Sequence, residues 1–238
     1  MKTINLWLLA LLLVLVGAGT AFASSCGTNT YDNYVGPPPI TCTILVPAPG
    51  NTRTLSNFSY SSAGTDLMPA NQITVSSVAS PASAGLLFNA PWTTSAGKTQ
   101  QSLIGFTTTL SSGSSLFNGL TLLMFGAGYF GTGSVSVSES YCLGDTFSDG
   151  CAHGTTGTLS TFLNGKGSKL IDTVSFAGVH VVDVEKDIQL TGGDRGFAVL
   201  SGVENQILET PVPEPGSLAT LASGLIAMAG LLGRRLFA

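Results

Sequence analysis

The central part of the sequence predicts an all-β fold, a single β-sandwich of the jelly-roll or immunoglobulin-like type. Three observations lead to this class. No stretch between Ser24 and Pro211 repeats apolar residues at i, i+3, i+4 and i+7 for long enough to form a helix. Instead, short runs rich in β-branched and aromatic residues are separated by Gly, Pro, Asn and Ser. Some runs also alternate apolar and polar residues, as a strand with one buried and one hydrated face requires.

The expected strands follow one another at spacings that suit a sandwich. They are Ile40 to Val46, Thr54 to Tyr60, Gln72 to Ala79, Ser102 to Leu110, Leu120 to Phe125, Gly133 to Tyr141, Thr158 to Asn164, Val174 to Val184, Lys186 to Thr191 and Gly196 to Ile207.

Alternation is strict in the run GSVSVSESY, where valines and Tyr141 face one way and serines face the other. The same period runs through VVDVEKDIQL, with Asp183, Glu185 and Asp187 opposite the apolar residues. Lys186 interrupts the apolar side. We therefore expect a β-bulge near Glu185 and Lys186 that breaks the row of carboxylates.

The amino terminus, Met1 to Ala23, has the features of a secretory signal peptide. Lys2 precedes the apolar stretch Ile4 to Val16, and the segment closes on small residues at Ala21 and Ala23. This pattern predicts export by the Sec translocon and cleavage by signal peptidase after Ala23.

The four cysteines all fall in the exported part, and their even number predicts disulfides in an oxidising compartment. Four cysteines allow three pairings, and we favour Cys26 with Cys42 and Cys142 with Cys151 because these close short loops. No pair has the spacing of a zinc site. The second bridge would close a turn in which Asp145 to Gly150 lacks the acidic ladder of a calcium loop.

Composition restricts the partners. Only 9% of the residues are charged, and the formal net charge is −4. Nucleic-acid binding requires clustered Lys and Arg, so we exclude it, and anionic partners in general are disfavoured. Calcium and neutral glycans remain compatible with this balance.

The strongest candidates for chemistry are the three carboxylates on one strand face. Together with Asp172 or Asp194 from neighbouring loops, Asp183, Glu185 and Asp187 could supply oxygen ligands to calcium. The simpler interpretation, which we favour, is a hydrated strand face that resists edge pairing. No metal and no cofactor is therefore assigned.

Signals for catalysis are absent from the sequence. There is no nucleophile elbow, zinc-protease motif, P-loop or dinucleotide-binding glycine motif. His180 lies in GVHVVDV, on the face of Val182 and Val184, where we expect a buried core histidine, and His153 lies in a glycine-rich turn. No catalytic residue is assigned, and the protein is not expected to be an enzyme.

Two groups of aromatic residues are expected in loops. Trp92 follows Pro91, and Tyr129 and Phe130 lie in AGYFG. Exposed aromatics beside amides and hydroxyls can stack on sugar rings. We favour packing under a loop for these residues, and an exposed Trp92 would instead indicate glycan binding.

The carboxyl-terminal tail begins with Pro213, Glu214 and Pro215. The apolar run Leu218 to Leu232 that follows would span about 23 Å as a helix, less than the ~30 Å hydrocarbon core of a bilayer. Arg234 and Arg235 would stay on the cytoplasmic side, which places the body of the protein outside.

The triplet, the apolar run and the basic end, in this order, resemble a PEP-CTERM sorting signal. The resemblance covers 212–238. It implies that the protein comes from bacteria that have a Gram-negative type envelope and make exopolysaccharide. It also implies that an exosortase processes the tail, with transient anchoring by a transmembrane helix in the inner membrane. The expected organisation is thus a signal peptide at 1–23, an exported β-sandwich at 24–211 and a sorting tail at 212–238.

Three functions are compatible with the sequence. The favoured one is a structural or interaction protein of the cell envelope, cell surface or extracellular matrix. The second is a glycan-binding module of the exopolysaccharide matrix, and the third is a secreted hydrolase. The hydrolase would need two carboxyl groups close together in a cleft.

Overall fold

The computed structural model describes residues 26–37, 40–45, 52–80, 83–110 and 115–211. The predicted signal peptide and sorting tail lie outside these ranges. In the part of the chain that is described, no helix is long and apolar enough to cross a membrane.

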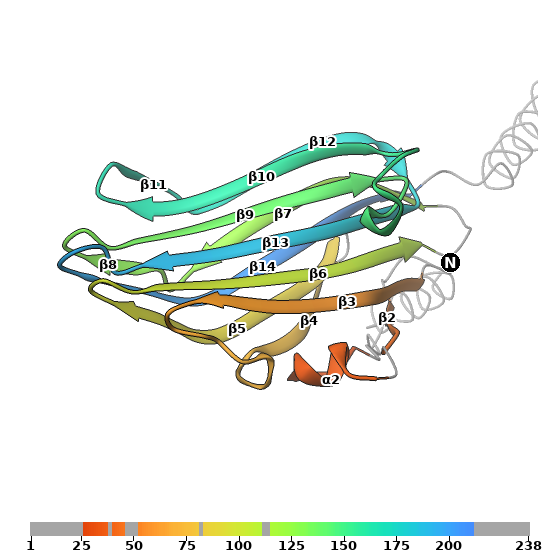
Figure 1. Cartoon of the computed structure of the whole chain (residues 1–238). Coiled ribbons are helices and arrows are strands. Elements are labelled where there is room, and N and C mark those ends of the chain that lie inside the picture. The colour runs from red at the N-terminus through yellow and green to blue at the C-terminus, as the bar shows by residue number, and fades with distance from the viewer. Residues whose placement is uncertain (1–25, 38–39, 46–51, 81–82, 111–114, 212–238) are drawn as a thin grey trace, which may run out of the picture.

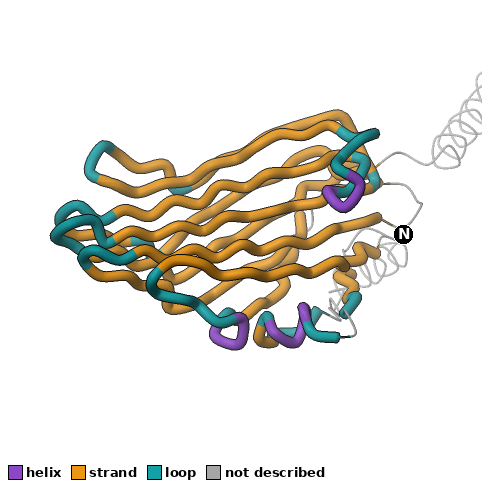
Figure 2. Tube along the Cα trace, viewed as in Figure 1, coloured by secondary structure: helices purple, strands orange, loops and turns teal. Residues whose placement is uncertain are grey.

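Two antiparallel sheets are packed face to face, which confirms the predicted β-sandwich (Figure 1). The first sheet has the strand order β11-β10-β9-β13-β6-β3-β2. The second has the order β1-β4-β5-β14-β7-β12, with β8 paired to β14. Among the described residues the helical elements are short, and strands make up nearly all of the trace (Figure 2).

The elements run in chain order as follows. They are β1 (Asn29–Thr30), α2 (Asp32–Val35), β2 (Cys42–Leu45), β3 (Thr52–Gly64), the 3-10 turn η1 (Ala70–Gln72), β4 (Thr74–Ser80), β5 (Ser83–Ser95), β6 (Thr99–Leu110), β7 (Ser115–Phe125), β8 (Gly128–Phe130), β9 (Ser134–Leu143), the 3-10 turn η2 (Phe147–Asp149), β10 (Thr155–Asn164), β11 (Gly167–Lys169), β12 (Ile171–Val179), β13 (Val181–Thr191) and β14 (Phe197–Pro211).

Most expected strands are present, but the sequence interpretation missed β5. The segment around Trp92 was expected to be a loop because it contains Pro91, which cannot donate a ladder hydrogen bond. The pairing of β5 with β4 ends at Asn89, and the pairing with β14 shifts register between Leu200 and Gly202, opposite this proline. The proline therefore occupies a position where the ladder is already interrupted.

The boundary between β12 and β13 also differs from the expectation. One continuous strand was predicted over 174–184, whereas β12 ends at Val179 and β13 begins at Val181. His180 lies in the turn between them and is exposed. The prediction of a buried core histidine is therefore wrong.

The expected bulge at Glu185 and Lys186 does not form. Strand β13 pairs without a register shift with β6 over 181–191 and with β9 over 182–191. Lys186 keeps its inward position and is fully buried, where it forms an ion pair with Glu139 of β9. A buried partner thus removes the need for a bulge, and the row of carboxylates on the opposite side remains unbroken.

The core lies between the inner faces of the two sheets and includes an aromatic cluster near α2. Tyr31 is fully buried and makes edge contacts with Phe58 at 6.1 Å and Phe88 at 5.8 Å between ring centroids. Its hydroxyl donates to the backbone oxygens of Ser59 at 3.1 Å and Gly105 at 2.9 Å. This residue therefore supports β3 and β6 from the inside.

Both predicted disulfides are confirmed. Cys26 is bonded to Cys42, and Cys142 is bonded to Cys151. Disulfides persist in oxidising compartments, which agrees with an extracellular or periplasmic protein. The second bridge closes the loop between β9 and β10, which contains η2.

Candidate binding face

The outer surface of the first sheet carries many polar side chains. We call the outward side of β9, β13, β6 and β3 the polar face. Its outward residues include the serines of β9 and the acidic and amide residues of β13, as the sequence alternation predicts. They are Ser134, Ser136, Ser138, Ser140, Asp183, Glu185, Asp187 and Gln189.

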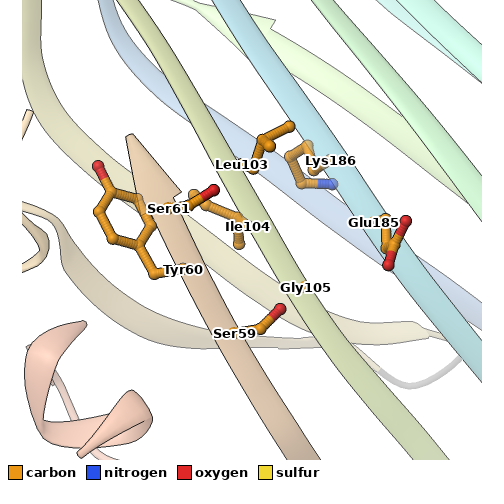
Figure 3. Close-up of a pocket in the computed structure, with 8 residues that line it drawn as sticks. All are labelled: Ser59, Tyr60, Ser61, Leu103, Ile104, Gly105, Glu185 and Lys186. Carbon is orange, nitrogen blue, oxygen red and sulfur yellow. The ribbon is translucent and has the colours of Figure 1, made fainter. Parts of the chain in front are cut away.

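A hollow opens in the polar face beside small residues of two neighbouring strands, β6 and β3. Glu185 of β13 lies opposite Gly105 of β6, which in turn lies opposite Ser59 of β3. A Cβ atom on Gly105 would lie 2.4 Å from Ser59 Oγ, so the absence of a side chain leaves this space open. The hollow has a volume of about 350 Å³, and Figure 3 shows Glu185 and Ser59 flanking it.

We call this hollow and the one beside it the groove. One of its walls is the loop closed by the bridge between Cys142 and Cys151. A neighbouring hollow of about 330 Å³ shares Ser59, Gly105 and Glu185 with the first and is bounded by Phe147 and Ser148. The backbone N–H of Phe147 donates to Asp183 Oδ2 at 2.8 Å, and Thr107 Oγ1 donates to Asp183 Oδ1 at 2.9 Å. Asp183 therefore anchors the wall and is largely buried.

The loop also has an internal acidic anchor. Hydrogen bonds from the backbone N–H groups of His153 and Thr146 hold the pKa of Asp145 below its ordinary value. His153 itself is exposed. The segment Asp145 to Gly150 thus forms the disulfide-closed turn that its sequence predicts.

Glu185 and Asp187 differ in their surroundings. Glu185 is exposed and has no polar partner among the described residues. Asp187 accepts hydrogen bonds from Gln101 Nε2, at 3.0 Å to each oxygen, and from Gln189 Nε2 at 2.6 Å. Since each glutamine uses its NH₂ group here, its carbonyl oxygen remains available to a ligand.

An apolar side chain lies among these polar groups. Leu103 lies opposite Asp187 in β13 and Ser61 in β3, and it is 43% exposed. From Glu185 to Gln189 the strand advances about 13 Å. An extended ligand along β13 would meet carboxylate, amide and hydroxyl groups together with one apolar contact.

The carboxyl groups considered for calcium are not brought together. Asp183 accepts hydrogen bonds from Thr107 and from the backbone of the loop. Asp172 lies on β12 in the second sheet, where it pairs with Lys169 and accepts a hydrogen bond from the backbone N–H of Ser160. Asp194 lies between β13 and β14, beyond the end of the carboxylate row. Across the described ranges, no three His, Cys, Asp or Glu residues are grouped to hold a metal ion.

The aromatic residues are divided between core and surface. Trp92 is fully buried on β5, and its Nε1 donates a hydrogen bond to Ser102 Oγ at 3.2 Å. Its favoured core role is therefore confirmed. The exposure of Trp92 that would indicate glycan binding is not found. Phe130 on β8 is 66% exposed and stacks on Phe197 of β14 at 5.9 Å. The expectation that Phe130 packs under a loop is therefore wrong.

Sequence reasoning missed the partners of the carboxylate row. Gly105, Leu103 and Gln101 come from β6 and Ser59 from β3, and only strand order and register bring them beside β13. The glycine within the run SLIGFTTTL was the available signal, because an isolated glycine in a strand often marks an open or closely approached site.

Comparison with known proteins gives a sparse result. No family model and no curated protein matches the chain. Among solved structures, it is similar to TmCBM61 in complex with beta-1,4-galactotriose, at 5% sequence identity and a TM-score of 0.28, over 64% of this chain and 88% of that chain. A similarity of this size carries no inference about the ligand of the present protein.

Proposed function

We propose that this chain is an exported cell-envelope or extracellular-matrix protein that acts by binding, and that its polar face holds a neutral glycan. The observation that carries this proposal is the groove itself. The Glu185 carboxylate and two serine hydroxyls line a hollow beside Gly105, and Leu103 offers an apolar contact in the same place. Asp187 and its two glutamine partners continue the polar face along β13.

The chemistry of these groups favours a hydroxyl-rich ligand. Ionised carboxylates accept strong hydrogen bonds, and amide oxygens accept further ones, so adjacent sugar hydroxyls would find several acceptors. Leu103 can contact the C–H face of a sugar ring. The acidic row of β13 repels polyanions, which favours neutral over acidic polysaccharides.

Binding without turnover is the mechanism we propose. A glycosidase requires two carboxyl groups placed on either side of a scissile bond. Glu185 and Asp187 lie on the same face of one strand, and Asp187 is engaged by two glutamines. This arrangement favours holding a ligand along the strand.

The route to the surface completes the proposal. The signal peptide at 1–23 would direct Sec export, and an exosortase would process the tail after the inner membrane has held it transiently. The mature protein should then lack Leu218 to Ala238, and replacing Pro213, Glu214 and Pro215 by alanine should leave it uncut in the membrane. Mass spectrometry of the mature carboxyl terminus tests this step, and an intact Ala238 on surface-located molecules would refute it.

Affinity electrophoresis in neutral and in uronic-acid polysaccharides tests the binding function. We expect retardation in at least one neutral polysaccharide and a loss of affinity of about tenfold in Glu185→Gln, because one charge-assisted hydrogen bond is lost. Glu204→Gln is the matched control, since it changes the same charge on the second sheet and should leave binding unchanged. Equal losses in both variants, or no retardation in any neutral polysaccharide, would contradict the proposal.

A further inference from the structure

Three polar side chains meet in the apolar core between the two sheets. They are Lys186 on β13, Glu139 on β9 and Asn205 on β14, and all three are fully buried. Lys186 and Glu139 are direct cross-strand neighbours in the first sheet, whereas Asn205 reaches them from the second. Of the three, only Lys186 borders the hollow of the polar face, and its side chain is fully buried.

Their hydrogen bonds place an amine beside a carboxamide. Lys186 Nζ donates to Glu139 Oε2. Asn205 Nδ2 donates to Glu139 Oε1 at 2.9 Å and to Oε2 at 3.1 Å. The amine nitrogen and the amide nitrogen thus share one carboxylate oxygen, while Asn205 Oδ1 has no partner among the described residues.

The surroundings exclude water. Lys186 Nζ lies 6.0 Å from the centroid of the buried Phe88 ring. Val184 and Ile188 flank Lys186 on the inner side of β13, and both are buried. An ion pair in such a place carries a large desolvation cost, which even good geometry offsets only in part.

A second buried ion pair shows what a purely structural arrangement looks like. The guanidinium of Arg53 is paired with Glu209 and also donates to the backbone oxygens of Ala84 and Ile207. A guanidinium stays protonated in proteins and is no nucleophile, whereas a lysine amine that gives up its proton becomes one. Of the two buried ion pairs in the described residues, only the Lys186 cluster therefore combines a potential nucleophile, a proton acceptor and an electrophilic carbonyl carbon.

We propose that Lys186 and Asn205 form an intramolecular isopeptide bond, with Glu139 as the catalytic residue. The ammonium of Lys186 first transfers a proton to the Glu139 carboxylate through their hydrogen bond. The free amine then attacks Cγ of Asn205, forming a new C–N bond and a tetrahedral intermediate with negative charge on Oδ1. Glu139 moves a proton from the attacking nitrogen to Nδ2, the Cγ–Nδ2 bond breaks and ammonia leaves.

The atoms and charges balance without any co-reactant. A protonated amine, a carboxylate and a carboxamide become a secondary amide, a neutral carboxyl group and ammonia. The two buried charges disappear, so the reaction removes the electrostatic cost of the unreacted cluster. The product also joins β13 in the first sheet to β14 in the second, which restricts the unfolded chain as a disulfide does.

Tryptic mapping of the full chain after reduction of its disulfides tests the bond directly. Trypsin should cut after Lys169 and Arg195 but not after Lys186, because the acylated side chain is no longer recognised. We expect residues 170–195 to remain one peptide that is joined to the peptide beginning at Gly196. The joined product should weigh about 17 Da less than the two peptides together, because one ammonia is lost.

Two matched variants assign the roles. Lys186→Arg keeps the positive charge but provides no comparable nucleophile, and it should restore cutting after position 186 and abolish the joined peptide. Glu139→Gln keeps the size of the side chain but removes the proton acceptor, and it should slow linkage by about a hundredfold or more.

The wild-type map decides the proposal even where a variant does not fold. Recovery of an unmodified peptide 170–186 in full yield from folded wild-type protein would overturn it. Joining at the wild-type rate in Glu139→Gln would overturn the role of Glu139 in catalysis.

Discussion

Glu185 and Lys186 are neighbours in sequence and lie on opposite sides of β13 in opposite surroundings. Glu185 is exposed on the polar face and has no polar partner among the described residues, whereas Lys186 is fully buried and contacts Glu139. Strand alternation thus places the side of β13 that we propose for binding opposite the side that packs in the core. Substitutions on the two sides should separate these properties.

The largest effect is expected inside the sandwich, at the ion pair of Arg53 and Glu209. Glu209→Gln leaves a buried guanidinium without its carboxylate and should cost about 3–5 kcal/mol of unfolding free energy. Replacing both residues, Arg53→Met with Glu209→Leu, should recover most of this loss. Denaturant unfolding measures both variants, and a double variant less stable than the single one would show that the pair is net stabilising.

The next largest effect should come from the bridge that holds the wall of the groove. Cys142→Ser with Cys151→Ser should cost about 2–4 kcal/mol and also weaken ligand binding, because the loop that carries Phe147 and Ser148 loses its covalent closure. The control is Cys26→Ser with Cys42→Ser, which should lower stability by a similar amount and leave the affinity of the folded protein unchanged. Calorimetry measures the stability of the two double variants, and ligand titration well below the unfolding midpoint measures their affinity. Equal affinities of the two variants would show that the loop is not part of the binding site.

On the outer side, filling the hollow should affect binding more than folding. Gly105→Ala places a methyl group against Ser59 Oγ, which a rotation of that side chain can relieve. We expect affinity to fall about tenfold, about 1.4 kcal/mol, with a smaller change in unfolding free energy. Unchanged affinity in this variant would place the ligand elsewhere on the molecule.

The smallest effect is expected from Asp145 in the loop. The folded state lowers the pKa of Asp145, so its contribution to stability is present above the unfolded pKa, near 4, and is lost as pH falls through the folded value. Asp145→Asn should therefore lower the unfolding midpoint slightly at pH 7. The difference from wild type should vanish at strongly acidic pH, and a difference that grows on acidification would contradict the assignment.

The sequence predicted those features that depend on local pattern. Alternation in β9 and β13 correctly placed the serines and carboxylates outward, and the short spacings of the cysteines correctly indicated their pairing. The fate of Lys186 was not predictable in this way, since Glu139 and Asn205 lie 47 and 19 positions away in sequence. A bulge was the only local means of accommodating a charge on the apolar side, whereas the fold provided a distant partner.

The groove was beyond local pattern for the same reason. The alternation of one strand, β13, predicts where the carboxylates lie. Gly105 and Ser59 lie beside them only because the strands follow the order β13-β6-β3 in the sheet. The exposed pair of Phe130 and Phe197 likewise depends on the pairing of β8 with β14. Strand order is set by packing of the whole core. Residues on three strands can therefore lie side by side although no sequence motif connects them.

Carboxyl labelling of the exported protein tests the proposed binding face most directly. Carbodiimide coupling of a small amine, with and without saturating neutral polysaccharide, can be quantified by mass spectrometry at Glu185, Asp187 and Glu204. We predict that the ligand protects Glu185 and Asp187 and leaves Glu204 on the second sheet unchanged. Equal labelling of Glu185 and Asp187 with and without bound polysaccharide would contradict the assignment of the polar face as the binding site.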